Sequence, residues 1–272
     1  MNTKINVSLT DDICFKYIFS KEEILKDFLN SFFEYIGEEE RIRGLKTSTE
    51  KEMFGKKYKN KIFYGVILAY TNTGKIISIE MYKEFQKEEF NKSVSYLTRI
   101  FSSQLERGEK YREIHKTIGL NFMKGNYHYN NFYLVNNYGF VNKLNYGVIK
   151  DECLEMYLIR LDLVKEKVYN EEEKRFIKWL KIINGKEIEE MREEAKEDEV
   201  MERALQFMEE FLADEEIKNV YDKINDVERV ALHKGEKKGI IKTAKNLLQL
   251  NIAIEDISKA TGLSIKELEN LN

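Results

Sequence analysis

The sequence predicts an α/β fold in which helices cover a mixed sheet, followed by a C-terminal helical extension. Two strand-like runs, Ile62–Tyr70 and Lys75–Tyr82, flank a short turn. Amphipathic helical patterns stand on both sides of this hairpin. From Lys186 onward the pattern is helical only. We therefore expect one α/β domain at residues 1–185 and a helical extension at 186–272.

The N-terminal part of the chain predicts a helix over Leu9–Tyr35 with a break near Ser20. Its apolar residues recur at helical spacing and form one face: Phe15, Ile18, Phe19, Ile24, Leu25, Phe28, Leu29, Phe32 and Phe33. Residues 42–49 are expected to form a short strand.

The central hairpin contains one ionisable residue that its apolar surroundings do not explain. Asn72 and Gly74 tolerate the positive φ angles that a tight turn requires. In the second strand, alternation places Ser78, Glu80 and Tyr82 on one face of the sheet. A carboxylate at the far end of so apolar a hairpin suggests a functional site.

The elements after the hairpin complete the predicted sheet and its helices. We expect a helix over Phe90–Gly108, a strand over each of Glu113–Met123, Asn131–Asn136 and Cys153–Leu163, and a helix over Asn170–Ile183. The core face of the first helix should hold Val94, Leu97, Ile100, Phe101 and Leu105. Trp179 should lie in the core.

The last residues predict a small helix-turn-helix hairpin. Its helices are Ile254–Ala260 and Ser264–Leu271, and Gly262 lies in the turn. Ser264 and Glu267 have capping-box spacing. Because acidic residues outnumber lysines in the second helix, we interpret the hairpin as a packing or assembly element rather than a DNA reader.

Composition and charge limit the class of protein. The chain has 272 residues, 42% hydrophobic and 34% charged, as expected of a globular protein. It shows no signal peptide, no long apolar run, and no cysteine spacing typical of disulfides or metal sites, so we expect a cytoplasmic protein without a membrane partner. Residues 41–61 are rich in Lys and Arg, whereas residues 187–216 are acidic. The lysines and arginines of this basic stretch either contact the phosphates of a nucleic acid or are solvated side chains of an exposed loop.

Four stretches carry a family resemblance. They are Asp12–Asn30, Ala69–Met81 (AYTNTGKIISIEM), Tyr96–Tyr111 (ending QLERGEKY) and Lys242–Leu268. Together they resemble the Rpn family of recombination-promoting nucleases, also called PD-(D/E)XK nuclease family transposases. The resemblance implies a restriction-endonuclease-like fold, with a mixed sheet flanked by helices, and the family activity of a Mg²⁺-dependent DNA endonuclease.

Three positions depart from the pattern of this family. Val66 stands where the family has an Asp, Tyr82 where it has a Gln or Lys, and Ser93 where it has an Arg. A nuclease of this class holds Mg²⁺ between two carboxylates, and valine offers no oxygen to a hard cation. We therefore predict a degenerate active site.

The resemblance also gives candidate site residues. Glu80 is the candidate metal ligand and catalytic residue, if Mg²⁺ is used at all. Asp12 and Lys16, on the first helix, are further catalytic candidates, although Asp12 has a helix-cap interpretation as well. The candidate nucleic-acid-binding residues are Lys56, Lys57, Lys59, Lys61 and Lys92.

Three functions remain open at this stage. The first is a nuclease-like protein without catalysis that binds DNA, RNA or a protein partner, as a regulator or inhibitor of a nucleic-acid enzyme. The second is an active Mg²⁺-dependent endonuclease with a rearranged site around Glu80, completed by an acid such as Glu50, Glu84 or Glu89. The third is a decaying mobile-element protein with no current role. The helical arms also suggest a homodimer.

Overall fold

The computed structural model describes residues 8–49, 67–82, 87–106, 108–124, 133–145, 147, 153–164, 170–215, 219 and 235–271. The chain forms two compact units, Met1–Ala213 and Asp214–Asn272. Helices α6 (Ile188–Ala195) and α7 (Glu199–Ala213), which the sequence analysis placed in the extension, lie within the first unit.

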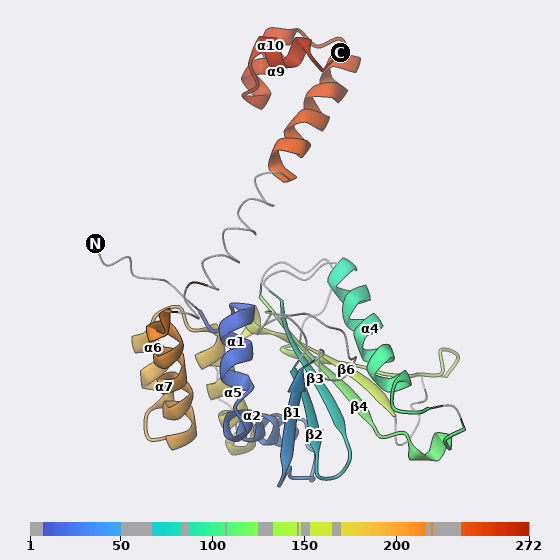
Figure 1. Cartoon of the computed structure of the whole chain (residues 1–272), viewed down its shortest axis with the longest axis vertical. Coiled ribbons are helices and arrows are strands. Elements are labelled where there is room, and N and C mark those ends of the chain that lie inside the picture. Colours follow the sequence, from blue (N-terminus) through green and yellow to red (C-terminus); the bar gives the residue numbers. More distant parts are fainter. Residues whose placement is uncertain are drawn as a thin grey trace. The chain divides into compact units, whose positions relative to one another are not determined.

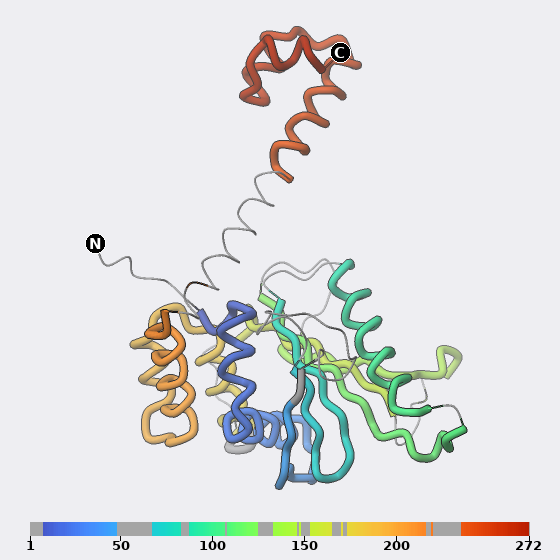
Figure 2. The backbone as a smooth tube through the Cα atoms, in the orientation of Figure 1, coloured from blue at the N-terminus to red at the C-terminus, as the bar shows by residue number. Residues whose placement is uncertain are grey.

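The described part of the first unit contains a six-stranded mixed sheet in the order β1-β2-β3-β4-β6-β5. The strands are β1 (Leu45–Thr49), β2 (Ile67–Thr71), β3 (Ile76–Tyr82), β4 (Thr117–Met123), β5 (Val135–Tyr138) and β6 (Leu154–Arg160). Strands β3, β4 and β6 run parallel, and the β1–β2, β2–β3 and β5–β6 pairs are antiparallel. Figures 1 and 2 show helices on both faces of this sheet, which confirms the predicted fold class.

The β2–β3 hairpin has the predicted positive φ at Gly74 but not at Asn72, whose side-chain Oδ1 instead accepts hydrogen bonds from the N–H groups of Arg43 and Gly44. Gly74 has φ +90°, and its N–H donates to the Thr71 carbonyl at 3.0 Å. A side chain at Gly74 would also meet the ring of His115. Both the positive φ and the close approach therefore favour glycine here.

One face of the sheet is covered by α1 (Asp12–Phe19), α2 (Glu22–Tyr35) and α5 (Glu171–Asn184). The break near Ser20 separates α1 from α2, as predicted. Phe122 of β4 contacts both Phe15 and Phe28 with ring centroids 5.6 Å apart. Trp179, also predicted in the core, is 1% exposed and packs on Phe28.

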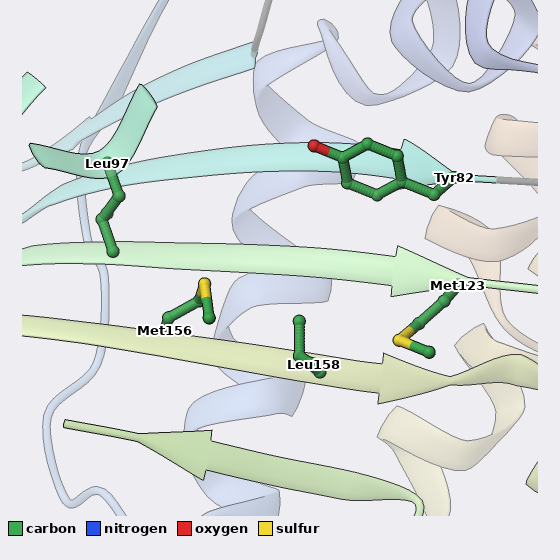
Figure 3. Packing of buried hydrophobic residues seen from close by; sticks show 5 residues of the cluster. All are labelled: Tyr82, Leu97, Met123, Met156 and Leu158. Atoms are coloured by element: carbon green, nitrogen blue, oxygen red, sulfur yellow. The ribbon is translucent and has the colours of Figure 1, made fainter. Parts of the chain in front are cut away.

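Helix α4 (Lys87–Ser102) covers the opposite face. Figure 3 shows the apolar cluster beneath it, formed by Tyr82, Leu97, Met123, Met156 and Leu158. The prediction that Val94 belongs to this core was wrong, because Val94 is 37% exposed and Ser93 is the buried neighbour at 3%. The helix presents Ser93 to the sheet because the polar groups of Tyr82 and Asn121 lie beneath it.

Two strand predictions were too long. The residues predicted as Glu113–Met123 include the end of a 3₁₀ turn, η1 (Tyr111–Glu113), before β4 begins. The run predicted as Cys153–Leu163 ends in a second 3₁₀ turn, η2 (Leu161–Leu163). Of the predicted strand Asn131–Asn136, residues 131–132 lie outside the described residues.

Helices α6 and α7 are joined to α2 and α5 by a polar cluster. Arg175 of α5 contacts Asp27 of α2 at 2.8 Å and Asp198, which precedes α7, at 2.5 Å. The Trp179 indole N–H donates to Asp27 at 2.8 Å. Burial opposes the charged form of Arg175, but its two carboxylate partners raise its pKa overall, and Arg175 lowers the pKa of Asp198.

The second unit has a small core of its own. A helix over residues 235–249, α9 (Ile254–Thr261) and α10 (Ile265–Glu269) enclose Ala244, Ile257 and Leu268. Gly262 has φ +72°, and Ser264 and Glu267 form the predicted capping box. None of the helices that the structure describes is both long and apolar enough to span a membrane.

Candidate active site

Glu80 lies near the carboxyl end of β3, on the side of the sheet that α4 covers. It is 8% exposed, and in the parallel β3–β4 ladder its partner is Asn121. Asn121 is also buried. The sheet register therefore places two polar side chains side by side within an apolar layer.

Tyr82 and Ser93 complete a continuous polar contact beneath α4. The Tyr82 hydroxyl lies 2.5 Å from Glu80 Oε2 and 2.9 Å from Ser93 Oγ. Ser93 Oγ donates to Asn121 Oδ1 at 2.9 Å, and Asn121 Nδ2 donates to the Tyr157 carbonyl at 3.3 Å. Figure 3 shows the Tyr82 ring lying along β3, with its hydroxyl pointing back from the end of the strand. Tyr82 and Ser93, two of the three positions that the sequence analysis predicted to depart from the family pattern, thus contact each other.

The surroundings of Glu80 favour its neutral form. Burial is the main effect and raises its pKa, while contact with Tyr82 and the charges of Lys92 and Lys16 oppose the rise. Asp12 adds to it. Burial, followed by the charge of Glu80, raises the pKa of Tyr82 well above its ordinary value. The site therefore disfavours negative charge on both groups.

The two candidates on α1 form an ion pair near this site. Lys16 Nζ lies 2.5 Å from Asp12 Oδ2, one helical turn away. Asp11, not Asp12, is the N-cap residue, and its side chain makes no capping hydrogen bond. Both members of the pair influence Glu80 electrostatically. The structure thus brings Asp12 and Lys16 into the electrostatic neighbourhood of Glu80.

Lys92 is the candidate phosphate-binding residue that the structure describes. It is exposed, and its ammonium lies 5.3 Å from the Tyr82 ring centroid and 5.6 Å from that of Tyr96. The remaining candidates, Lys56, Lys57, Lys59 and Lys61, lie outside the described residues, as does Val66. Lys92 therefore places a positive charge at the solvent side of the Glu80 site.

Among the residues that the structure describes, the donor set around Glu80 does not fit Mg²⁺. Magnesium requires several oxygen ligands in octahedral geometry, usually with one or two carboxylates. In the described part of the chain, no group of three or more Asp, Glu, His or Cys side chains could hold a metal ion. Glu80 supplies one carboxyl group, and Tyr82 already occupies one of its oxygens. Val66, which the sequence analysis aligned with the second ligand position and which lies outside the described residues, has no oxygen in its side chain.

Sequence reasoning did not identify Asn121 as part of the site. It is separated from Glu80 by a helix and a loop, and only the strand register brings the two together. Ser93 was noted as a departure from the family pattern but not as a hydrogen-bonding group. Its spacing could have indicated a buried position, because Ser93, Leu97 and Ile100 lie on one face of α4.

Comparison with known proteins gave one finding. A family model described as PD-(D/E)XK nuclease family transposase matches residues 9–231. Neither the curated proteins nor the solved structures gave a match. The matched residues include the six described strands and helices α1, α2 and α4 to α7, whereas the small helical core at 235–271 lies beyond them.

Proposed function

The chain belongs to the family of PD-(D/E)XK nuclease family transposases, and from this membership we propose that it has kept the nuclease fold, lost catalysis, and acts by binding nucleic acid. The observation that carries the proposal is the contact between Glu80 and the Tyr82 hydroxyl. This contact ties the carboxyl group of Glu80, the candidate catalytic acid, into a buried polar network.

A site that no longer binds a divalent metal ion would have lost catalysis for a simple chemical reason. Nucleases of this family generally use a divalent metal ion, which activates water and stabilises the charge that develops on the phosphate. Here Val66 and Tyr82 occupy two of the positions that would complete the site. A single, largely buried Glu80 offers too few oxygens for Mg²⁺.

Binding of nucleic acid follows from the charges that remain. Lys92 is exposed beside the aromatic rings of Tyr82 and Tyr96, and lysines at 56–61 extend the positive charge along the sequence. Helices α6 and α7 are predominantly acidic and would repel phosphates. We therefore place the nucleic-acid surface on the side of Lys92.

The binding half of the proposal is tested with a fluorescent DNA duplex and the matching RNA, titrated at several salt concentrations. Lys92→Ala should weaken binding and reduce the salt dependence by about one phosphate contact. Lys143→Ala, in the exposed segment after β5, is the matched control and should bind like wild type. If neither nucleic acid binds, the proposal is refuted and a protein partner becomes the remaining binding function.

The catalytic half is tested by incubating supercoiled plasmid with the protein in Mg²⁺ or Mn²⁺. We expect no cleavage. Cleavage that Glu80→Ala abolishes would show an active endonuclease, whose missing carboxylate would have to come from a residue such as Glu50, Glu84 or Glu89.

A further inference from the structure

The helix over residues 235–249 packs its apolar side into the core of the second unit. Ala244 is fully buried in the cluster that this helix forms with α9 and α10, and Leu247 and Leu248 pack against the same cluster (Figure 1). Residues 244, 247 and 248 share one side of the helix because three and four positions separate them. The remaining side of the helix therefore faces away from the core.

Three lysines lie on this outer side. Lys238, Lys242 and Lys245 follow one another at i, i+4 and i+7, so they form a single row, and all three are exposed. We call these three residues the lysine face. At 1.5 Å per residue, its first and last members are about 10 Å apart along the helix axis. Phosphates follow one another about every 3.4 Å along the axis of each strand of a duplex, so each lysine can contact a different phosphate.

The lysine face has no acidic partner among the residues that the structure describes. In the described part of the second unit, the ion pair that is present joins Lys259 to Asp256 of α9 at 4.0 Å, and none includes a residue of the lysine face. Three neighbouring ammonium groups in water therefore offer their full charge to an external anion.

The three helices of the second unit differ in charge. The helix over residues 235–249 has four lysines and one glutamate. Helices α9 and α10 have more acids than lysines: Glu255, Asp256, Glu267 and Glu269 against Lys259 and Lys266. A polyanion would therefore approach the first helix rather than the α9–α10 hairpin.

A phosphate backbone fits the lysine face better than a protein or a membrane does. The exposed positions that continue the face, Asn246 and Gln249, are polar as well. Protein interfaces are depleted in lysine and have an apolar centre, which this face does not supply. A basic helix at a membrane surface buries its apolar side in lipid, whereas here that side is packed against α9 and α10.

We propose that the lysine face is a second nucleic-acid contact, in which the three lysines bind backbone phosphates without reading the base sequence. The inference deepens the proposed function and rests on it, because it assigns a second surface of the chain to the same partner. The surface lies beyond residues 9–231, so membership of the family did not indicate it. The α9–α10 hairpin then supports the basic helix and does not itself contact nucleic acid, in agreement with its excess of acids.

The test is titration of two fluorescent DNA duplexes of unrelated sequence with the full chain at several salt concentrations. Lys242→Gln/Lys245→Gln removes two charges, and glutamine is as good a helix former as lysine. The slope of log K against log salt should become shallower by about 1.8, since each phosphate contact contributes about 0.9. At about 0.1 M salt the variant should bind about tenfold more weakly or worse, and equally so for both duplexes.

Control variants separate the position of the charges from their number. Lys259→Gln/Lys266→Gln removes two exposed lysines from α9 and α10 and should bind like wild type. Lys242→Arg/Lys245→Arg keeps both charges and should also bind like wild type. If circular dichroism shows that Lys242→Gln/Lys245→Gln has lost helix, Lys238→Gln repeats the test with an expected change in slope of about 0.9.

A salt slope that does not change when the lysine face is neutralised would overturn the inference, and so would an equal loss in the α9–α10 control. The outcomes also separate this inference from the proposed function. If Lys92→Ala weakens binding and the lysine-face variant does not, the inference is refuted and the proposed function stands. If only the lysine-face variant weakens binding, the inference stands and the proposed surface at Lys92 is refuted. A wild type that binds neither duplex refutes both.

Discussion

The Tyr82 hydroxyl is the atom on which the buried network depends, and Tyr82→Phe removes it without changing the ring. The ring packs with Leu97, Met123, Met156 and Leu158, and phenylalanine can keep these contacts (Figure 3). Any loss of stability should therefore report the hydroxyl alone.

The expected loss follows from the partners that the variant leaves behind. Glu80 and Ser93 would each lose the Tyr82 contact, and both are buried. An unsatisfied buried polar group costs about 1–3 kcal/mol, and Ser93 keeps its bond to Asn121. We therefore expect the free energy of unfolding to fall by about 2–4 kcal/mol.

The assay is urea unfolding followed by Trp179 fluorescence, which reports the first unit because this is the only tryptophan in the chain. The matched control is Tyr133→Phe, whose side chain is 74% exposed and should change stability by no more than about 0.5 kcal/mol. A loss below about 1 kcal/mol in Tyr82→Phe would show that the network does not hold the site together.

Three further changes test other parts of the structure. Asp27→Ala should lower the free energy of unfolding by about 2–3 kcal/mol, because the buried Trp179 N–H loses its acceptor. Asp27→Asn keeps an acceptor oxygen and should lower it less. Urea unfolding compares the two variants, and equal losses of stability would contradict the reasoning. Gly74→Ala should lower the free energy of unfolding by about 1–3 kcal/mol in the same assay, since φ is +90° and the new Cβ would lie 2.5 Å from His115 Nδ1. An unchanged midpoint of urea unfolding would exclude this turn conformation. Burial raises the pKa of Glu80 above its ordinary 4.5, so its contribution to stability is full below pH 4.5 and is lost as pH rises through the native pKa. Unfolding of Glu80→Gln at a series of pH values should lack this dependence, and parallel curves for the two proteins would refute it.

Much of the fold can be read from the sequence because local patterns determine it. The break near Ser20, the positive-φ turn at Gly74 and the capping box at Ser264 each depend on residues close together in the chain. The core position of Trp179 follows from helical periodicity. These features need no knowledge of long-range contacts.

The candidate site could be predicted only in part. Glu80 was chosen as a candidate because it is an acid within an apolar strand and matches a family motif. Asn121 was missed because its position depends on the β3–β4 register, which sequence periodicity does not reveal. Val94 was favoured over Ser93 as a core residue because hydrophobicity alone was considered, whereas the buried side of α4 faces a polar network. The sequence analysis noted Ser93 only as the loss of an arginine, whereas in the structure Ser93 forms hydrogen bonds with Tyr82 and Asn121.

Restoration of the family motif must take this coupling into account. Replacing Tyr82 alone would remove one of the two hydrogen-bond partners of Ser93 and would leave a serine where the family has an arginine. The informative variant is therefore Val66→Asp/Tyr82→Gln/Ser93→Arg, which replaces all three departures together.

Cleavage of supercoiled plasmid in Mg²⁺ or Mn²⁺ by wild type, by this triple variant and by the triple variant with Glu80→Ala tests the loss of catalysis most directly. We predict that wild type leaves the plasmid intact, that the triple variant cuts it, and that removing Glu80 abolishes the cut. Metal-dependent cleavage by wild type that Glu80→Ala abolishes would contradict the account.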